Sequence, residues 1–198
     1  MTETNENSGS TAAAPDSTAV IAATVAWIER AVIGLELCPF ARAAHTGRRI
    51  RYVVTEAGEP EALVEVLVAE LEWLAAADPA ELETTLLIHP HVLTDFLDYN
   101  EFLDVADAAV EQLGLTGVVQ VASFHPQYQF AGTAANDIDN YTNRSPYPTL
   151  HLLREDSVER AVAAHPDTNR IFENNIETLR RLGHDGWNAL NITTESKR

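Results

Sequence analysis

Lysine is almost absent from the sequence: the only one, Lys197, is the next-to-last of 198 residues. Enzymes that form a Schiff base, attach pyridoxal phosphate or bind nucleotide through a Walker A loop need a lysine inside the folded body. A lysine so close to the end of the chain is unlike those sites. We therefore expect none of these chemistries, and no pyridoxal phosphate.

Cysteine and patterned glycine are also missing. The single cysteine, Cys38, excludes disulfide bonds within the chain, a C-x-x-C redox pair and an iron–sulfur cluster held by one chain. The nine glycines form neither the G-x-G-x-x-G pattern of dinucleotide-binding folds nor the G-x-S-x-G turn of serine hydrolases. The sequence therefore predicts no dinucleotide and no iron–sulfur cluster. It leaves chemistry based on histidine, carboxylates or one thiol, or no chemistry at all.

Positive charge and long apolar runs are scarce too. Thirteen Lys and Arg stand against 30 Asp and Glu, and the net charge of −17 argues against nucleic acid and anionic membrane surfaces as partners. No apolar stretch approaches the length of a membrane span, and residues 1–17 contain no apolar core of a signal peptide. We expect a cytoplasmic protein that binds no nucleic acid and no membrane.

What the sequence does contain is an alternation of short apolar runs with longer amphipathic segments. Four apolar runs predict strands, at 50–54, 84–88, 117–124 and 149–153. Helical spacing predicts helices that begin near Thr18, Pro60, Thr94, Ser157 and Asp167. This alternation predicts an α/β fold: a single domain over residues 18–187, with helices packed on a four-stranded, mostly parallel sheet. Residues 1–17 and 188–198 are predicted to be disordered tails.

The last two predicted strands are joined by an unusually long segment, residues 125–148. Connections in compact domains are usually about 4–6 residues long, and much longer ones are either disordered or functional. This segment carries more ring side chains than disordered segments do, namely His125, Tyr128, Phe130, Tyr141 and Tyr147. We expect an ordered loop that forms part of a site.

Two of the predicted strands end in the same dipeptide, histidine followed by proline. His89 follows the second strand and His125 follows the third. The carboxyl ends of parallel strands lie at one edge of a sheet, and the sites of open α/β sheets form there. We therefore expect the two histidines to share a pocket, in which either can act as general acid or base.

Two further histidines, His91 and His151, are predicted near the same edge. Imidazole is the commonest metal ligand, so the candidate metal ligands are His89, His91, His125 and His151. A divalent metal stays open as a cofactor. No compact spacing such as H-E-x-x-H supports a metal site, and histidines that bind backbone groups at strand ends explain the pattern without a metal.

The single cysteine lies beside a cluster of arginines. Pro39 suits the first position of a helix, which would make Cys38 its N-cap and favour the thiolate. Four arginines follow within ten residues: Arg42, Arg48, Arg49 and Arg51. Two interpretations stay open. One is an activated thiol beside an anion-binding loop, and the other is a buried small side chain beside arginines that pair with carboxylates.

Taken together, these patterns favour an enzyme that acts on a small anionic substrate at the carboxyl ends of the strands. Cys38 would be the nucleophile, and His89 or His125 the general acid or base. The substrate would be bound by side chains of the basic loop and of the long loop, namely Arg42, Arg49, Tyr128, Asn143 and Arg144. The alternative is a regulatory protein that binds a small ligand or a metal without catalysis. The sequence identifies neither the substrate nor the oligomeric state.

Four longer stretches carry a resemblance to a known family. They are GLELCPFARA, TTLLIHPHVLTDFLDYNEFLDVAD, VASFHPQYQFAG and NYTNRSPYPTLHLLRE. Together they resemble the bacterial family called domain of unknown function 1415 (DUF1415), from about Trp27 to Trp187. The resemblance implies a small cytosolic α/β protein, and it implies no activity, cofactor or catalytic residue.

Overall fold

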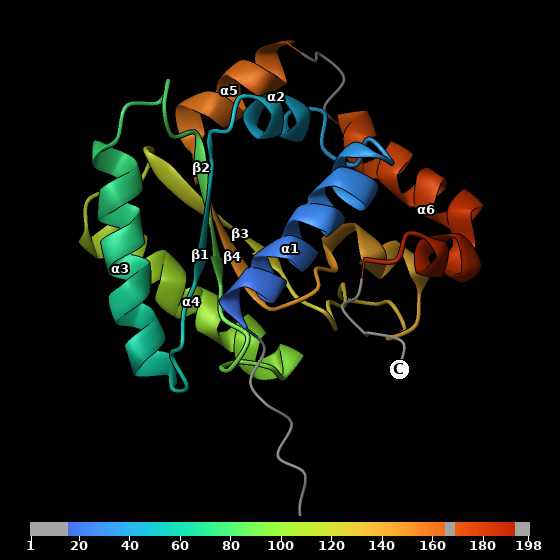
Figure 1. Ribbon diagram of the computed structural model, residues 1–198, viewed down its shortest axis with the longest axis horizontal. Helices are drawn as coiled ribbons and strands as arrows, with labels where there is room; N and C mark the ends of the chain where they lie inside the picture. Colours follow the sequence, from blue (N-terminus) through green and yellow to red (C-terminus); the bar gives the residue numbers. More distant parts are fainter. Residues whose placement is uncertain (1–15, 165–168, 193–198) are drawn as a thin grey trace, which may run out of the picture.

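The structure, a computed structural model, describes residues 16–164 and 169–192 of the chain (Figure 1). It confirms the predicted α/β class, since four strands form one sheet with helices packed on it. Two strands coincide with the predicted runs, namely β1 (Ile50–Val54) and β2 (Thr84–Ile88). The other two, β3 (Val119–Phe124) and β4 (Thr149–Arg154), differ from the predicted runs by two residues or fewer.

The sheet is mixed, so the prediction of a mostly parallel sheet was wrong. The strand order is β1-β2-β4-β3, with β1 and β2 parallel and β4 antiparallel to both of its neighbours. We had taken the alternation of strands and helices as a sign that neighbouring strands run parallel. Instead, the chain turns back at the edge where β3 ends, and a strand that starts there can only run antiparallel to β3. β1, β2 and β3 still point the same way, so their carboxyl ends lie at one edge.

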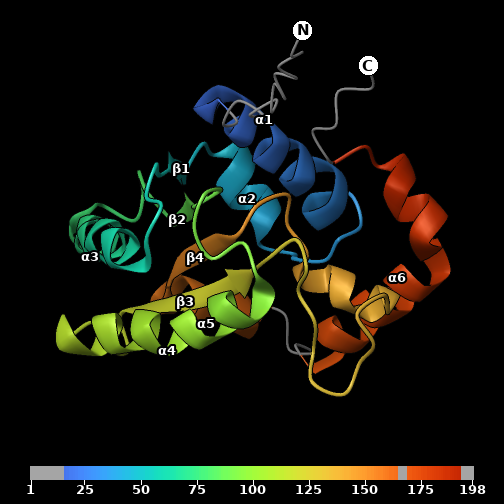
Figure 2. The ribbon, with the colours of Figure 1, turned by 90° about the horizontal axis from the view of Figure 1, so that it is seen from below.

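One face of the sheet is covered by α3 (Pro60–Ala76) and α4 (Phe96–Gln112), as Figure 2 shows. Alternate side chains of the strands meet these helices, among them Leu87 of β2 and Leu150 of β4. The N-cap of α4 is Asp95, one residue after Thr94, and its side chain accepts the backbone N–H groups of the first turn. The two helices and the sheet enclose the larger of the two hydrophobic cores.

The opposite face is covered by α1 (Ser17–Trp27), which continues into the short π-helix η1 (Ile28–Ile33). Trp27 packs edge-on against Phe124 of β3, with 5.2 Å between the ring centroids. Tyr52, Leu86 and Ile88 also belong to this second core. α2 (Ala41–Thr46) follows η1 and leads into β1. The sheet therefore lies between two helical layers.

The last helices, α5 (Glu155–Ala164) and α6 (Asn169–Ala189), follow β4. α6 packs against the 3₁₀-helix η2 (Ile138–Asn143) of the long loop rather than against the sheet (Figure 2). Gly183, with a φ of 66°, is not helical, and it divides α6 into two helical segments. Ile192 lies beyond the predicted end of the domain at residue 187, and it is buried in the second core, the one on the side of α1. The predicted helix start at Asp167 and residues 1–15 and 193–198 of the predicted tails lie outside the described residues.

The sequence of α6 is polar. Within residues 16–164 and 169–192, no helix combines the length and the apolar composition that crossing a membrane requires.

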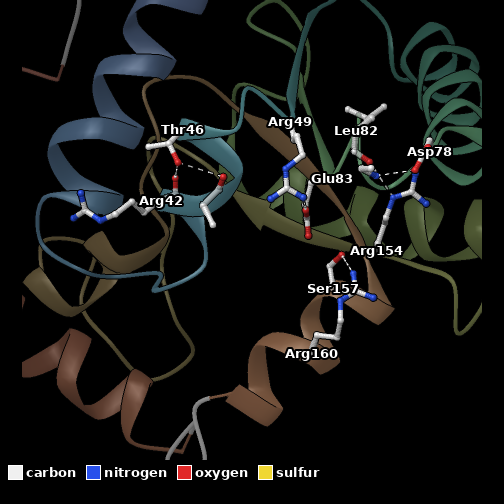
Figure 3. A network of polar contacts seen from close by, with 11 residues as sticks. Arg42, Thr46, Arg49, Asp78, Leu82, Glu83, Arg154, Ser157 and Arg160 are labelled. Carbon is white, nitrogen blue, oxygen red and sulfur yellow. Dashed lines mark hydrogen bonds and ion pairs between the residues drawn. The ribbon is translucent and has the colours of Figure 1, made fainter.

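Arg154, the last residue of β4, joins the sheet to the end of α3 at the edge opposite the two His-Pro turns. Its buried guanidinium donates to the carbonyl oxygen of Leu82 at 3.1 Å (Figure 3). It also donates to the carbonyl oxygens of Leu74 at 2.5 Å and Ala77 at 2.6 Å. The last two carbonyls belong to the end of α3, where a helix leaves its C=O groups without partners. A cation at this position also offsets the negative end of the helix dipole.

We predict that Arg154→Met lowers the free energy of unfolding by about 3 kcal/mol or more, because three buried carbonyls lose a charged donor. Urea unfolding at neutral pH measures the change. The matched control is Arg160→Met, since Arg160 is exposed on α5 and, among the described residues, donates only to the Ser157 hydroxyl. It should change stability by about 0.5 kcal/mol or less. Equal costs for the two variants would show that the carbonyls do not depend on Arg154.

Candidate functional site

His89 and His125 lie directly after β2 and β3, at the carboxyl edge of the sheet. β4 begins between them, so the two strand ends are two strand spacings apart, roughly 10 Å. The ring of Tyr99, from α4, fills the space between the two buried imidazoles. Its centroid is 5.7 Å from that of His89 and 5.0 Å from that of His125. The structure therefore brings the two histidines into one stack of rings, through a tyrosine that the sequence pattern did not single out.

The hydroxyl of Tyr99 bonds to the strands on both sides of it. It donates to the carbonyl oxygen of Thr149 at 2.8 Å and accepts the backbone N–H of Phe124 at 3.1 Å. Phe124 and Thr149 are the last residue pair between β3 and β4. Burial raises the pKa of Tyr99 well above its ordinary value, so the hydroxyl stays protonated and keeps both bonds. In the sequence, Tyr99 looks like any other apolar position of a helix. Only its place near the start of the helix that follows a His-Pro strand end distinguishes it.

Both ring nitrogens of His125 are bound to backbone groups. Nδ1 accepts the N–H of Gln127 at 3.0 Å, so Nε2 carries the proton and donates it to the carbonyl oxygen of Leu93 at 3.2 Å. Burial lowers the pKa of His125. The imidazole is therefore neutral at pH 7 and has no free lone pair for a substrate or a metal. It joins the loop after β3 to the loop after β2.

His89 differs from His125 because one of its nitrogens has no partner. Nδ1 lies 2.9 Å from the carbonyl oxygen of Val92 and must donate to it, so Nε2 keeps its lone pair. That Nε2 is buried and has no hydrogen-bond partner among the described residues. Burial lowers the pKa of His89 to about 4, which keeps the ring neutral at pH 7. A buried acceptor left unpaired costs about 1–3 kcal/mol, so this atom is unusual in a core.

The other two histidines do not complete a metal site. Nε2 of His91 lies 3.5 Å from a carboxylate oxygen of Glu56. His151, in the middle of β4, has its Nε2 2.7 Å from the hydroxyl of Thr84, and burial lowers its pKa to about 4. In the described part of the chain, no three His, Cys, Asp or Glu side chains are grouped so that they could hold a metal ion. The four candidate ligands therefore do not converge.

We had predicted Cys38 at the start of a helix, but it lies in a turn. α2 begins three residues later, at Ala41, whose N–H bonds to the carbonyl oxygen of Cys38 at 3.3 Å. Burial raises the pKa of the thiol, which favours the interpretation of Cys38 as a buried small side chain over that of an activated thiol. Within the described residues, no hydrogen bond joins Cys38 to His89 or His125.

Arg42 and Arg49 belong to the opposite edge of the sheet (Figure 3). Arg49 precedes β1 and forms an ion pair with Glu83, which precedes β2. Arg42, on α2, donates to the carbonyl oxygen of Ile33 at 3.4 Å. A strand of five residues spans roughly 17 Å, so Arg49 is too far from His89 to bind the same small substrate. The basic loop after Cys38 thus does not meet the histidines, because β1 and β2 start where it ends.

The loop at 125–148 is ordered, as predicted, and it packs over the carboxyl edge of the sheet. Its backbone bonds to both histidines: the N–H of His125 donates to the carbonyl oxygen of Asn143 at 3.2 Å, and that of His89 to Pro148 at 3.1 Å. The side-chain amide of Asn143 donates to the carbonyl oxygen of Ser123 in β3 at 3.1 Å. The loop is therefore fastened to β2 and β3 at the two residues that follow them.

A buried amide holds the loop together from inside. The Oδ1 atom of Asn140 accepts the N–H of Phe130 at 3.0 Å and the hydroxyl of Thr133 at 2.8 Å. Its Nδ2 atom donates to the carbonyl oxygen of Ala134 at 2.8 Å. Asn140 is completely buried, whereas Phe130, one of the ring side chains that predicted an ordered loop, is half-buried. No pattern in the sequence separates Asn140 from the other polar residues around it.

Three of the predicted binding residues, Tyr128, Asn143 and Arg144, lie together in this loop. The guanidinium of Arg144 donates to the carbonyl oxygens of Tyr128 and Ala135 and lies over the Tyr141 ring, 4.2 Å from its centroid. It forms no ion pair with a carboxylate of the described residues. Its charge also acts to lower the pKa of His125. Arg144 is thus a fixed positive charge beside the stacked rings.

All the residues of this edge lie in the part of the chain that matches the model of a known family. The model of the family described as "Protein of unknown function (DUF1415)" matches residues 19–189. The chain belongs to this family. No curated protein and no solved structure matches it. The match confirms the resemblance seen in the sequence, and it assigns no activity to the DUF1415 fold.

Buried histidines make the stability of this DUF1415 protein depend on pH. The pKa of His89 and that of His151 are about 4 in the folded chain and about 6.5 in an unfolded one. Below about pH 6.5 the unfolded chain binds protons that the folded chain does not, so stability is complete above that pH and is lost as the pH falls towards 4. We expect each histidine to account for about 3 kcal/mol of this loss. Urea unfolding at a series of pH values checks it, and a flat profile would contradict it.

Asn140→Ala should loosen the loop and leave the sheet folded, because it removes three bonds that lie inside the loop. We expect proteases to cut within residues 125–148 much faster than in the wild type, at a cost of about 2 kcal/mol in local stability. The control is Asn136→Ala, an exposed position of the same loop. Equal cutting rates in the two variants would show that the buried amide does not hold the loop.

Proposed function

We propose that the protein is an enzyme that acts on a small anionic molecule at the carboxyl edge of the sheet, with His89 as its proton acceptor. One observation carries the proposal: the buried Nε2 of His89 has a lone pair and no hydrogen-bond partner among the described residues. A fixed, neutral imidazole with a free lone pair is what a general base offers a substrate. The carbonyl of Val92 and the ring of Tyr99 fix its orientation.

The charge of the substrate follows from the low pKa of His89. A group with a pKa of about 4 is a weak base at pH 7, and a general base works best when its pKa is near the ambient pH. A negative charge bound beside the imidazole favours the protonated form and raises the pKa. An anion would therefore activate the base that it needs, whereas a neutral molecule would not.

Arg144 is the positive charge that we assign to the binding of this anion. Two backbone carbonyls and the Tyr141 ring hold its guanidinium in place, so little side-chain entropy remains to be lost on binding. Tyr128 and Asn143, on the same loop, would add neutral hydrogen bonds. The net charge of −17 supports a small molecule, rather than nucleic acid or a membrane, as the partner of a cytoplasmic protein.

A second candidate function is binding without catalysis. It is favoured by how few reactive atoms are free at this edge. The thiol of Cys38 has a raised pKa, and both nitrogens of His125 are bound to backbone groups. His89 then acts alone, as an acceptor that orients a ligand.

Nitrogen NMR of the histidine side chains tests both functions, with inorganic phosphate as the anion because it carries both charge and a donor hydroxyl. We expect phosphate to shift the His89 Nε2 resonance, assigned with His89→Asn, and to raise the pKa of His89 towards neutrality. Arg144→Gln should weaken phosphate binding about tenfold or more, since it removes a charged donor. Arg181→Gln, an exposed position on α6, should not.

The outcomes separate the two functions. A shifted resonance with an unchanged pKa would favour binding without catalysis. A resonance that phosphate does not move would refute the proposed site. Asn140→Ala serves as the structural control, because it loosens the same loop without removing a charge.

A further inference from the structure

The bond between Gln127 and His125 can exist only while His125 is neutral. Nδ1 is the acceptor of this bond, at 3.0 Å, and Nε2 already donates its proton to Leu93. A second proton can enter the ring only at Nδ1, where it would point at the N–H of Gln127. Two donors facing each other repel, so protonation of His125 breaks the first contact of the 125–148 loop with its own strand end.

The charges around His125 come from each element packed against it. Asp95, at the start of α4, favours a protonated ring. Arg144, in the loop, disfavours it, and so does His89 if that ring is charged. Tyr99 and Tyr128 contribute neutral rings. Because Arg144 lies on the loop itself, a charged His125 repels the loop as well as losing its bond to it.

The loop and α6 are joined to one another by an ion pair and by an aromatic contact. Arg180 of α6 forms two bonds with the carboxylate of Asp139, at 2.9 and 2.6 Å. Tyr141 of the loop packs edge-on against Trp187 of α6, with 5.1 Å between the ring centroids. The loop is bonded to the sheet edge at two places, next to His125 through Asn143 and at His89 through Pro148. A change at His125 therefore acts on the loop and α6 together.

We propose that His125 is an acid-sensitive latch: a proton on its Nδ1 detaches the 125–148 loop, together with α6, from the carboxyl edge of the sheet. The sheet, α3 and α4 stay folded, because their core contains none of the bonds that break. The latch is independent of the proposed function, which uses His89 and does not need His125 to titrate. It is closed at neutral pH and opens below the ordinary pKa of histidine, about 6.5.

The three tryptophans report on both parts that the latch separates: Trp187 lies in the part that detaches, and Trp27 and Trp73 lie in the part that stays. Trp187 lies on α6 against the loop, Trp27 is buried against β3, and Trp73 is exposed on α3. The test uses the full-length chain labelled with fluorotryptophan and followed by fluorine NMR as the pH is lowered. We expect the Trp187 resonance to move to the position of an exposed indole in a step during which the Trp27 resonance stays in place.

Two substitutions identify the group that titrates. His125→Asn keeps an acceptor oxygen near the position of Nδ1 but cannot take up a proton, so the Trp187 step should disappear. Asp95→Asn keeps a good helix cap and removes the charge that favours a protonated His125, so the step should move to lower pH. His184→Asn is the control, because His184 also touches Tyr141 and its loss should leave the step unchanged.

Simultaneous movement of the Trp187 and Trp27 resonances would overturn the proposal, since it would mean that the whole protein unfolds in acid. A Trp187 step that persists in His125→Asn would overturn it as well. If His125→Asn does not fold at neutral pH, as judged by its Trp27 resonance, Asp95→Asn decides. A step at the wild-type pH in that variant refutes the latch, and a step at lower pH supports it.

Discussion

The insertion of β4 between β2 and β3 is the constraint on which the rest of the structure depends. β2 and β3 point the same way, and each of them bonds to β4 and not to the other. The chain must therefore travel from the end of β3 to a start point between two strand ends, and it does so over the carboxyl edge. The long loop, the ring of Tyr99 between two imidazoles and the bonds of the histidine backbones to Asn143 and Pro148 all follow from this one placement.

Polar bonds rather than apolar burial hold this edge together. A loop over the end of a sheet has many backbone groups that no ladder can satisfy, and each of them needs a partner if water is excluded. Asn140, Arg144, His125 and the hydroxyl of Tyr99 supply those partners. At this edge, His89 and His91 are the exceptions among the described residues, because each has a buried Nε2 without a hydrogen-bond partner, although that of His91 lies 3.5 Å from a carboxylate oxygen of Glu56. An edge that satisfies so many groups and leaves the Nε2 of His89 unpaired keeps a cost that a purely structural edge would avoid.

The strands could be predicted because each is marked by an apolar run within its own sequence. The helices could be predicted because apolar residues recur at helical spacing within each of them. The direction of β4 could not, since it depends on which pair of strands accepts it and no residue in Thr149–Arg154 encodes that choice. The two His-Pro turns were correctly expected at one edge, because β1, β2 and β3 are parallel. What the imidazoles do there was beyond prediction: the carbonyls of Val92 and Leu93 decide it, and a backbone carbonyl leaves no mark in a sequence. The sequence also contained no sign that Arg49 pairs with Glu83, because the two residues are distant along the chain.

The order of strands in the sheet also affects how the chain can be made. β1, β2 and β3 leave the ribosome before β4, yet β2 and β3 have no bonds to each other. Until residue 154 has emerged, both strands present an open inner edge of unpaired N–H and C=O groups, and such edges are where chains pair wrongly. The pairs between β2 and β4 join residues more than sixty positions apart, a separation that slows folding. A nascent chain that stalls inside the 125–148 loop thus holds two exposed strand templates, and completing β4 closes both of them at once.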